Sequence, residues 1–525
     1  MSNKSLFNTD NRAGRTSNMA GGAAYLMDAR HALAQIAVTN CFNGTFYASA
    51  EKNLELAKEA AIALKGDPEF IAKVAVYARN KAYMKDMPAF LTVLLSDIDK
   101  PLFRKVFRKV VDNGKMLRNV IQMARSGAVT GKVANMSAGT WRHAIQEWFN
   151  HQSCSSIFRA SIGNDPSMRD ILRMSRPKPN TDEKGALFGY LLGKEISLDR
   201  LPENIRQYEL FKRDKKGPVP DVDFRMLDSL GIGKIEWMEI ARNAPWTMTR
   251  MNLNTFARHG VFENNSITKI VAERLRDKDQ INAARVFPYQ LYVAWRQING
   301  NAAIPPEVKD ALQDAMEIAI ENVPVIPGNG IVCVDSSGSM SSPITGQRYG
   351  GQSSSVQCVE VAGLIASAVA RKNRQAQIWT FSDHALQVDL NPRDTVTTNT
   401  SKLSSAGGGT NISAPLRDLN AKRAKADWVL YVSDYESWLD NDRSYSYMGT
   451  GLAEEWEKFK SINPQARLIC CDLTPRNTSQ INNEVHADVL HVGGFSDTCF
   501  DVIADFIVNG NQSNHWVEVI KKYEV

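Results

Sequence analysis

The pattern of apolar residues changes at residues 324–330, and this change limits the fold more than any other feature of the sequence. Before this point, apolar residues recur at the spacing of an amphipathic helix, for example over 54–64, 70–83, 102–111, 141–149 and 308–320. Beyond it, short β-rich apolar runs alternate with helical segments. The chain therefore needs two architectures, an all-helical part followed by an α/β part.

The helical part, over residues 51–322, contains amphipathic stretches of roughly 10 to 15 residues separated by brief turns. The turns contain Gly, Pro, Asp or Asn, as in 66–68, 99–101 and 164–166. Stacked helix pairs of the HEAT-like class fit this organisation, although no strict sequence period is present. An irregular all-helical domain is the alternative.

The α/β part contains apolar runs that predict strands and, between them, segments that predict helices. The predicted strands are 331–334, 377–381, 428–432, 467–471 and 485–492, and the predicted helices are 356–371, 412–425, 452–462 and 498–508. Such alternation is typical of a parallel, doubly wound sheet. We place the boundary at 325–329 and assign residues 1–327 to the helical domain and 328–525 to the α/β domain.

The composition is that of a globular protein, with 43% hydrophobic and 23% charged residues, which excludes a wholly disordered chain. No apolar run approaches the roughly 18 residues that a membrane-spanning helix needs. The first residues, Met1 to Ser5, are polar and form no secretory signal core. We therefore expect a cytoplasmic protein without a membrane partner.

The net charge of +6 divides unevenly along the chain. Residues 1–329 carry 46 Lys and Arg against 35 Asp and Glu, a net charge of +11, whereas the remainder carries 17 against 22, a net charge of −5. Residues 101–181 alone hold 14 basic and 4 acidic side chains. Such a stretch is a candidate binding surface for a polyanion.

The seven cysteines argue against a disulfide framework and a zinc site. Their number is odd, no C-x-x-C pair occurs, and no histidine lies at zinc-ligand spacing. Cys333, Cys470 and Cys471 fall in predicted strands, where reduced and buried thiols are expected.

Three groups of oxygen-bearing side chains follow one another in the α/β part. They are Asp335, Ser337 and Ser339 after the strand 331–334, Thr410 after the glycines 407–409, and Asp434 after the strand 428–432. In open α/β sheets, ligands bind beyond the carboxyl ends of the strands, so these groups are expected to meet at one site. Alone, the first group would fit equally well as residues that cap the next helix.

This ordered set resembles the metal-ion-dependent adhesion site of von Willebrand factor type A domains. The resemblance implies that Ser337, Ser339 and Thr410 ligate a divalent cation directly. Asp335 and Asp434 then act partly through water, which leaves one position open for a carboxylate or other anion of a partner. Mg²⁺ is the expected cation, because it prefers octahedral oxygen ligands and keeps several of its waters.

Two further features bear on what this site can do. A hydrolytic metal centre needs a general base beside an activated water, and no histidine accompanies the motif. His384 follows a predicted strand and fits a loop residue better. The Ser- and Gly-rich segment 342–354 departs from the family's pattern as an inserted loop that can cover the metal face. We therefore expect a binding site and not an enzyme.

Within the basic stretch 101–181, one helical segment separates a charged face from an apolar one. The charged face consists of Arg104, Lys105, Arg108 and Lys109. Like charges at this spacing cost a helix about 0.2–0.5 kcal/mol per pair, so helix stability does not explain them. A solvated outer face is an equal alternative to polyanion binding.

A second helical segment begins at Ser167, which forms a capping pair with Asp170. Arg169, Arg173 and Arg176 then fall at i, i+4 and i+7 on one face. Because no acidic residue interrupts that face, the row can bind a phosphate backbone through charge-assisted hydrogen bonds. A solvated face or intramolecular pairing is the alternative.

Four segments of the helical part resemble, in order, parts of the TROVE module of the Ro autoantigen family. They are GTWRHAIQEWFN at 139–150, SMRDILRMSRPKP at 167–179, MTRMNL at 248–253 and ARVFPY at 284–289. A TROVE module followed by a type A domain is the architecture of that family, so the two resemblances cover nearly the whole chain. No single motif decides the match, but their order and joint presence do.

The resemblance implies an all-α ring of HEAT-like repeats, closed by a doubly wound type A domain. Ro proteins bind small noncoding Y RNAs on the basic outer surface of the ring and admit single-stranded ends of misfolded RNAs to its central hole. By motif position, the implied RNA contacts are Arg142, His143, Arg169, Arg173, Arg176 and Lys178, and the further candidates are Arg104, Lys105, Arg108 and Lys109. Arg176 stands where family members often have His, and Pro177 is a second departure.

The leading hypothesis is a nonenzymatic RNA-binding protein of RNA quality control or processing. Its type A domain binds a divalent cation and a protein partner. Bacterial relatives are associated with exoribonucleases, so an exoribonuclease is a candidate partner, whereas DNA is not. We expect a monomer. The alternative is a metal-dependent scaffold whose basic helices bind an acidic protein and which has no primary role with RNA.

Overall fold

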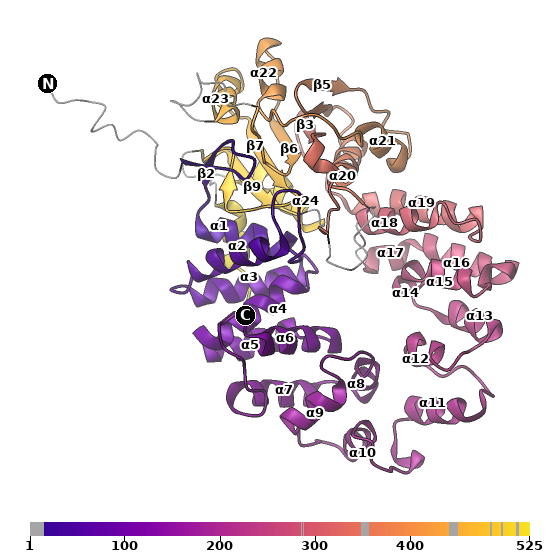
Figure 1. The fold of residues 1–525 in the computed structure, drawn as a ribbon. Helices are drawn as coiled ribbons and strands as arrows, with labels where there is room; N and C mark the ends of the chain where they lie inside the picture. Colours follow the sequence, from indigo (N-terminus) through magenta and orange to yellow (C-terminus); the bar gives the residue numbers. More distant parts are fainter. Residues whose placement is uncertain are drawn as a thin grey trace. The chain divides into compact units, whose positions relative to one another are not determined.

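The described residues fall into two units whose members do not simply follow the order of the chain (Figure 1). The computed structural model describes residues 15–284, 286, 288–347, 356–439, 450–482, 486–494, 497–510 and 514–525. Unit 1 contains the described residues of 1–64, 285–296 and 313–522. Unit 2 contains the residues 65–284, 297–312 and 523–525.

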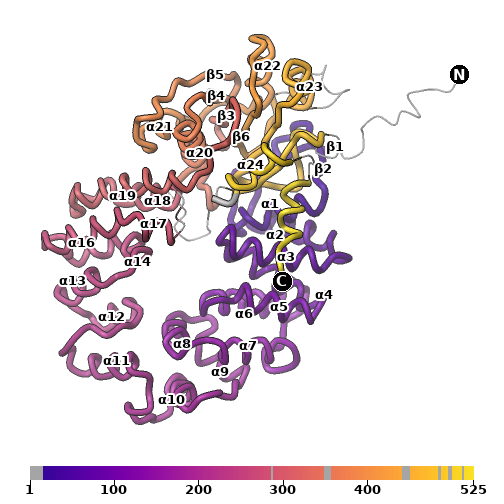
Figure 2. Tube along the Cα trace, turned by 180° about the vertical axis from the view of Figure 1, so that it is seen from behind, coloured from indigo at the N-terminus to yellow at the C-terminus, as the bar shows by residue number. Residues whose placement is uncertain are grey.

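Unit 2 is built of helices that succeed one another along the chain, as the sequence predicts (Figure 2). Over residues 65–284 they are α3 (Pro68–Asn80), α4 (Asp86–Ile98), α5 (Lys100–Val110), α6 (Gly114–Ser126), α7 (Gly139–His151), α8 (Cys154–Ala160), α9 (Met168–Ser175), α10 (Asp182–Leu191), α11 (Glu203–Asp214), α12 (Phe224–Asp228), α13 (Lys234–Asn243), α14 (Trp246–Met251), α15 (Leu253–Arg258), α16 (Asn265–Arg276) and α17 (Lys278–Ala284). Among the helices of the described residues, none has both the length and the apolar composition that crossing a membrane requires.

Helices two places apart in the chain pack on each other in the first half of unit 2. α3 contacts α5, α5 contacts α7, and α7 contacts α9, while α4, α6, α8 and α10 form a second column. The buried faces are the predicted apolar ones, and in α5 they consist of Phe103, Val106, Phe107 and Val110. This packing is that of stacked helix pairs, as in HEAT-like repeats.

A six-stranded sheet lies at the centre of unit 1. Its strands are β3 (Gly330–Asp335), β4 (Gln377–Phe381), β5 (Ala385–Val388), β6 (Trp428–Ser433), β7 (Arg467–Asp472) and β9 (Val489–Gly493), in the order β5-β4-β3-β6-β7-β9. All neighbours are parallel except β5, which pairs antiparallel with β4. The predicted parallel, doubly wound sheet is confirmed, and β5 adds an antiparallel edge strand that the sequence pattern did not predict. Of the predicted strand 485–492, residue 485 lies outside the described residues.

The strands β3 and β6 are buried along their whole length, so both faces of this sheet are covered, as in doubly wound folds. The predicted helices correspond to α20 (Cys358–Lys372), α22 (Ala414–Ala421), α23 (Gly451–Ile462) and α24 (Asp497–Asn509), and two unpredicted ones are α21 (Val396–Leu403) and α25 (His515–Lys521). β4 and β6 flank β3 on opposite sides. The chain therefore adds strands first on one side of β3 and then on the other. Ligands of open α/β sheets bind at such a point, beyond the carboxyl ends of the strands.

The N-terminal residues belong to unit 1 and not to the helical unit. The strands β1 (Arg15–Ser17), β2 (Ala23–Leu26) and β8 (Thr478–Ser479) form a small antiparallel sheet. The helix α1 (Ala29–Thr39) contacts both β9 and α2 (Ala50–Ile62). The units thus differ from the predicted division at residues 327 and 328, because strand pairing between distant segments leaves no local pattern in the sequence.

Parts of the segment before the type A sheet also belong to unit 1. They are α18 (Pro288–Ile298) up to Arg296 and α19 (Pro306–Ala319) from Gln313. In α18, the Tyr292 hydroxyl donates to Glu360 Oε1 at 2.8 Å, and Arg296 pairs with the same carboxylate at 3.1 Å. In α19, Glu317 pairs with Arg371 and accepts a hydrogen bond from the Val396 amide at 2.9 Å. These polar contacts fix the segment to α20 and α21.

A buried histidine makes the stability of unit 1 depend on pH. His491 in β9 is 2% exposed, and burial lowers its pKa to about 3 from 6.5. The folded state therefore binds fewer protons than the unfolded state below about pH 6.5, so the stability from this group is complete above that pH and falls as the pH drops. We expect the difference in unfolding free energy between wild type and His491→Gln to fall by about 2 kcal/mol between about pH 7.5 and about pH 5, measured with urea. A constant difference would contradict this.

Candidate metal centre and candidate RNA interface

The predicted metal-site residues of the first group lie where β3 ends. Asp335 is the last residue of that strand, and a 3-10 turn over Gly338–Ser341 follows. The Ser337 amide donates to Asp335 Oδ1 at 2.8 Å, and Ser433 Oγ, at the end of β6, donates to Asp335 Oδ2 at 2.5 Å. The hydroxyl oxygens of Ser337 and Ser339 are 3.2 Å apart. The motif thus forms one hydrogen-bonded turn at the point where the chain reverses across the sheet.

The other two groups lie against this turn. The Gly338 amide donates to Gly408 O at 3.1 Å, which holds the Gly-rich loop before Thr410 beside the turn. Asp434 follows β6 and lies beside Ser339. The structure therefore places the loops that carry the five predicted side chains against one another.

These five side chains form a buried group of oxygen donors, none more than 5% exposed. Burial, with the nearby Asp434 carboxylate, raises the pKa of Asp335, and burial likewise raises the pKa of Asp434. Two buried carboxylates that oppose each other's ionisation are stabilised by a dication. Because hydroxyl and carboxylate oxygens suit magnesium, the donor set fits the predicted cation.

Residues outside the motif also border this site, and no sequence signal marked them. Tyr47, between α1 and α2, lies beside Ser339. Glu436 lies two residues after Asp434, and its carboxylate forms a buried ion pair with Arg476 at 2.9 Å. Of the predicted inserted loop 342–354, residues 348–354 lie outside the described ranges.

The predicted RNA contacts all lie in unit 2, and their side chains are exposed. Ser167 begins α9 with the predicted capping box, in which its hydroxyl accepts from the Asp170 amide at 3.2 Å and the Asp170 carboxylate accepts from the Ser167 amide at 3.2 Å. Within the described residues, no carboxylate forms an ion pair with Arg173, Arg176 or Lys178. Their positive charges are therefore available to a ligand.

Arg176 departs from the predicted helical row. α9 ends at Ser175, and Arg176 has a left-handed backbone conformation with φ 46° and ψ 58°. Pro177 explains the helix end, because a proline disfavours helical backbone in the residue before it and has no amide hydrogen to donate. The Arg176 guanidinium thus lies at the carboxyl end of α9, where the helix dipole stabilises a positive charge.

α7 holds this end of α9 in place. Arg142 Nε donates to Ser175 O at 3.3 Å, and Gln146 Nε2 donates to the carbonyl oxygens of Ser175 and Arg176 at 2.8 and 3.1 Å. His143 Nδ1 lies 3.0 Å from a carbonyl oxygen one turn earlier in its own helix. Arg142 therefore positions the row of arginines in addition to contributing a charge.

The charged face of α5 is exposed as predicted, but Lys109 already forms a hydrogen bond. Lys109 Nζ donates to the backbone oxygen of Glu524 at 2.9 Å, within unit 2. Arg104, Lys105 and Arg108 form no ion pair in the described part of the chain.

A cavity of about 430 Å³ opens beside the end of α9. Its lining consists of Leu172, Arg173, Arg176, Pro177, Phe188 and Leu192. Leu172 and Phe188 are buried, so they form an apolar floor between two exposed guanidinium groups. The sequence motifs gave no sign of this cavity, because Phe188 and Leu192 come from α10 and its end.

This chain is similar to known proteins in sequence and in fold. The family model described as the Ro60 vWA domain matches residues 330–507. RNA-binding protein RO60 of Deinococcus radiodurans is 24% identical to this chain, over 93% of this chain and 94% of that protein. The crystal structure of the Deinococcus radiodurans RO (RSR) protein has the same fold, with a TM-score of 0.60 and 18% identity over 91% of this chain and 99% of that one. The matched type A domain, a relative that spans nearly the whole chain and the shared fold support the resemblance to the Ro family that the sequence motifs indicate.

Proposed function

We propose that this chain binds RNA through the surface formed by α7, α9 and the segment after α9, without catalysing a reaction. Its ligands are small structured noncoding RNAs of the Y type and the single-stranded ends of misfolded RNAs. One observation carries the proposal, the exposed row of Arg169, Arg173, Arg176 and Lys178. The name of the Deinococcus relative, an RNA-binding protein, supports it.

Guanidinium groups suit the phosphate backbone because each can donate two parallel hydrogen bonds to phosphate oxygens. Arg169 keeps part of this capacity, although its Nε donates to Leu191 O at 3.1 Å. Positive groups that neutralise phosphates release counterions from the nucleic acid, so binding must weaken steeply with salt.

The cavity beside α9 favours RNA over other polyanions. Unpaired bases stack on aromatic side chains and on arginine planes. The floor of Leu172 and Phe188 gives such a base an apolar surface, while Arg173 and Arg176 lie at its edge for the flanking phosphates.

We also propose that the site in unit 1 binds Mg²⁺ and, through an open coordination position, a carboxylate of a protein partner. Ser337, Ser339 and Thr410 are the direct ligands, and Asp335 and Asp434 complete the site. The cation supplies the charge that holds the partner's carboxylate. An exoribonuclease is the candidate partner, on the family resemblance.

The RNA proposal is tested by sequencing the RNA that copurifies with the full chain from its host. Enrichment of a few structured noncoding RNAs supports the proposal. If no RNA is enriched, and ribonuclease leaves the recovery of protein partners unchanged, the metal-dependent scaffold replaces it.

The metal proposal predicts that Asp335→Asn lowers Mg²⁺ affinity by more than about 100-fold, since even outer-shell partners of a metal contribute about 10- to 100-fold. Isothermal titration of the full chain with MgCl₂ measures this. Asp389→Asn, at an exposed aspartate after β5, is the matched control and leaves the affinity unchanged. Equal affinities of wild type and Asp335→Asn would refute the site.

A further inference from the structure

Two short N-terminal segments, residues 18–22 and 43–47, lie against the loops that carry the candidate metal ligands, all within unit 1. We call these segments the N-terminal clasp. They belong in sequence to the helical half of the chain, and the resemblances to the type A domain do not include them.

The first set of clasp contacts holds the loop after Asp434. The Ala20 amide donates to Glu436 Oε2 at 3.1 Å, and Glu436 pairs with Arg476 at 2.9 Å. Arg476 in turn donates to Thr45 Oγ1 at 3.1 Å. The side chains of the ion pair are 2% and 4% exposed, so both parts of the clasp meet one buried charge pair.

A second set of contacts connects the clasp to the Thr410 loop. Asn18 Nδ2 donates to Ser437 O at 2.7 Å, and Ser437 Oγ donates to Thr410 O at 3.0 Å. Gly22 packs so closely that a Cβ added to it would lie 1.8 Å from Ser437 O. The clasp thus holds Ser437 in place, and Ser437 connects the Asp434 loop to the Thr410 loop.

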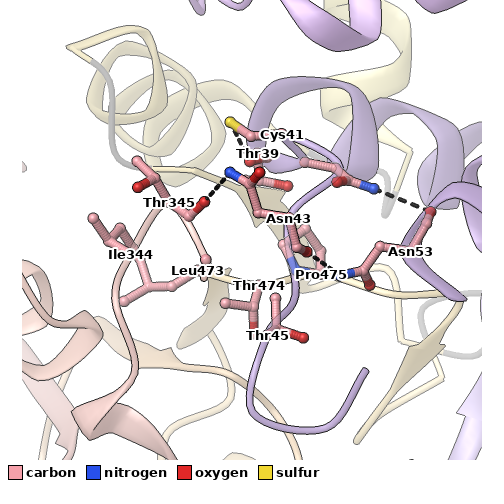
Figure 3. Close-up of a pocket in the computed structure, with 12 residues that line it drawn as sticks. Thr39, Cys41, Asn43, Thr45, Asn53, Ile344, Thr345, Leu473, Thr474 and Pro475 are labelled. Carbon is pink, nitrogen blue, oxygen red and sulfur yellow. Dashed lines mark hydrogen bonds between the residues drawn. The ribbon is translucent and has the colours of Figure 1, made fainter. Parts of the chain in front are cut away.

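The third set of contacts holds the segment that follows the Ser337–Ser339 turn in the chain. Asn43 Nδ2 donates to Thr345 O at 2.6 Å (Figure 3). Gly44 pairs with Gln347. The cavity there, lined by residues from 39–53, 344–346 and 473–475, has about 30 Å³, room for little more than water. It is too small for a ligand, so the clasp and the loop fit closely.

Tyr47 brings one further polar group to the site. It lies beside Ser339, and Asp434, Glu436 and Asp335 lie near it. A phenol carries no charge at neutral pH, so its hydroxyl can orient the Ser339 hydroxyl without opposing a cation.

We propose that the N-terminal clasp is a positioning element of the metal site, which holds all three ligand loops in place, so that clasp attachment and Mg²⁺ binding strengthen each other. This inference rests on the proposed metal site. Loops that are ordered in advance lose less conformational entropy when a cation binds, and the coupling between two such events is reciprocal. Typical couplings change an affinity by about 5- to 150-fold.

The test compares Mg²⁺ affinity, by isothermal titration, between the full-length wild type and two variants. Gly22→Ala forces the clasp off Ser437 and is expected to lower the affinity about tenfold or more. Tyr47→Phe removes one hydroxyl only and is expected to lower it about fivefold. The matched controls are Gly66→Ala, where an added Cβ meets nothing within 4 Å, and Tyr83→Phe, at an exposed tyrosine of unit 2. Both leave the affinity unchanged.

Hydrogen exchange gives a second readout that does not depend on any variant. Mg²⁺ added to the wild type is expected to slow amide exchange in residues 18–22 and 43–47. If the wild type binds Mg²⁺ but exchange and both variant affinities stay unchanged, the coupling is refuted and the metal site stands. If the wild type binds no Mg²⁺, the metal site itself is refuted, and the coupling with it.

Discussion

The triple variant Arg169→Ala, Arg173→Ala, Arg176→Ala is expected to bind RNA at least about 10³-fold more weakly than the wild type at low salt. Each charge-assisted hydrogen bond contributes about 1.5–3 kcal/mol, and the three guanidinium groups lie on one exposed surface. The slope of log affinity against log salt concentration is also expected to fall by about 2 to 3, because each lost phosphate contact removes about 0.9.

A fluorescently labelled stem-loop RNA with a single-stranded tail, titrated at several salt concentrations, measures both quantities. The matched control is Arg206→Ala, Lys212→Ala, Arg225→Ala, which removes the same charge from unit 2. Each of these residues is already paired, with Glu203, Glu209 and Asp223 respectively. Equal losses in the two triple variants would mean that only total charge matters, and the α9 surface would lose its assignment.

Arg476→Met is expected to destabilise unit 1 by about 3–5 kcal/mol, because it leaves the Glu436 carboxylate buried without its partner. Burial raises the pKa of Glu436 to about 6 even with Arg476 present, which shows that this carboxylate is costly to bury charged. Without Arg476 it must bear that cost or take up a proton. The same change also removes the hydrogen bond from Arg476 to Thr45 and frees one side of the N-terminal clasp.

Urea unfolding of the full chain, followed by tryptophan fluorescence, measures this loss. The double variant Glu436→Gln, Arg476→Met removes both charges and is expected to recover most of the stability, as is common when a whole buried ion pair is replaced. The control Arg159→Met removes one member of an exposed pair with Asp221 and leaves the unfolding midpoint unchanged. A double variant as unstable as Arg476→Met alone would show that the charge pair is not the cause.

The central strands were predictable because both of their faces are buried, which leaves continuous apolar runs in the sequence. The edge strand Ala385–Val388 escaped prediction, because it is short and none of its residues is fully buried. The small sheet of Arg15–Ser17, Ala23–Leu26 and Thr478–Ser479 escaped for another reason. Strands of two to four residues carry no usable period, and the pairing partner lies at the other end of the chain.

The candidate metal ligands were predictable because their chemistry forces a fixed set of oxygen donors at the ends of strands. Their supporting residues were not, since Tyr47, Glu436 and Arg476 have no characteristic spacing and act only through tertiary contacts. The place of Arg176 was predicted incorrectly, because periodicity alone continued the helix to Arg176, whereas Pro177 ends it at Ser175. Sequence patterns therefore located the chemistry of both surfaces but not the contacts that position it.

The pairing of β2 with β8 determines when unit 1 can be completed during synthesis. At about 5–20 residues per second, Thr478 leaves the ribosome on the order of a minute after Leu26. During that time α1, with Leu33, Ile36 and their buried neighbours, has no β9 to pack on. The helices over residues 65–284 emerge much earlier and can fold in the meantime. We therefore expect nascent chains that stop before residue 478 to expose α1 to chaperones and proteases.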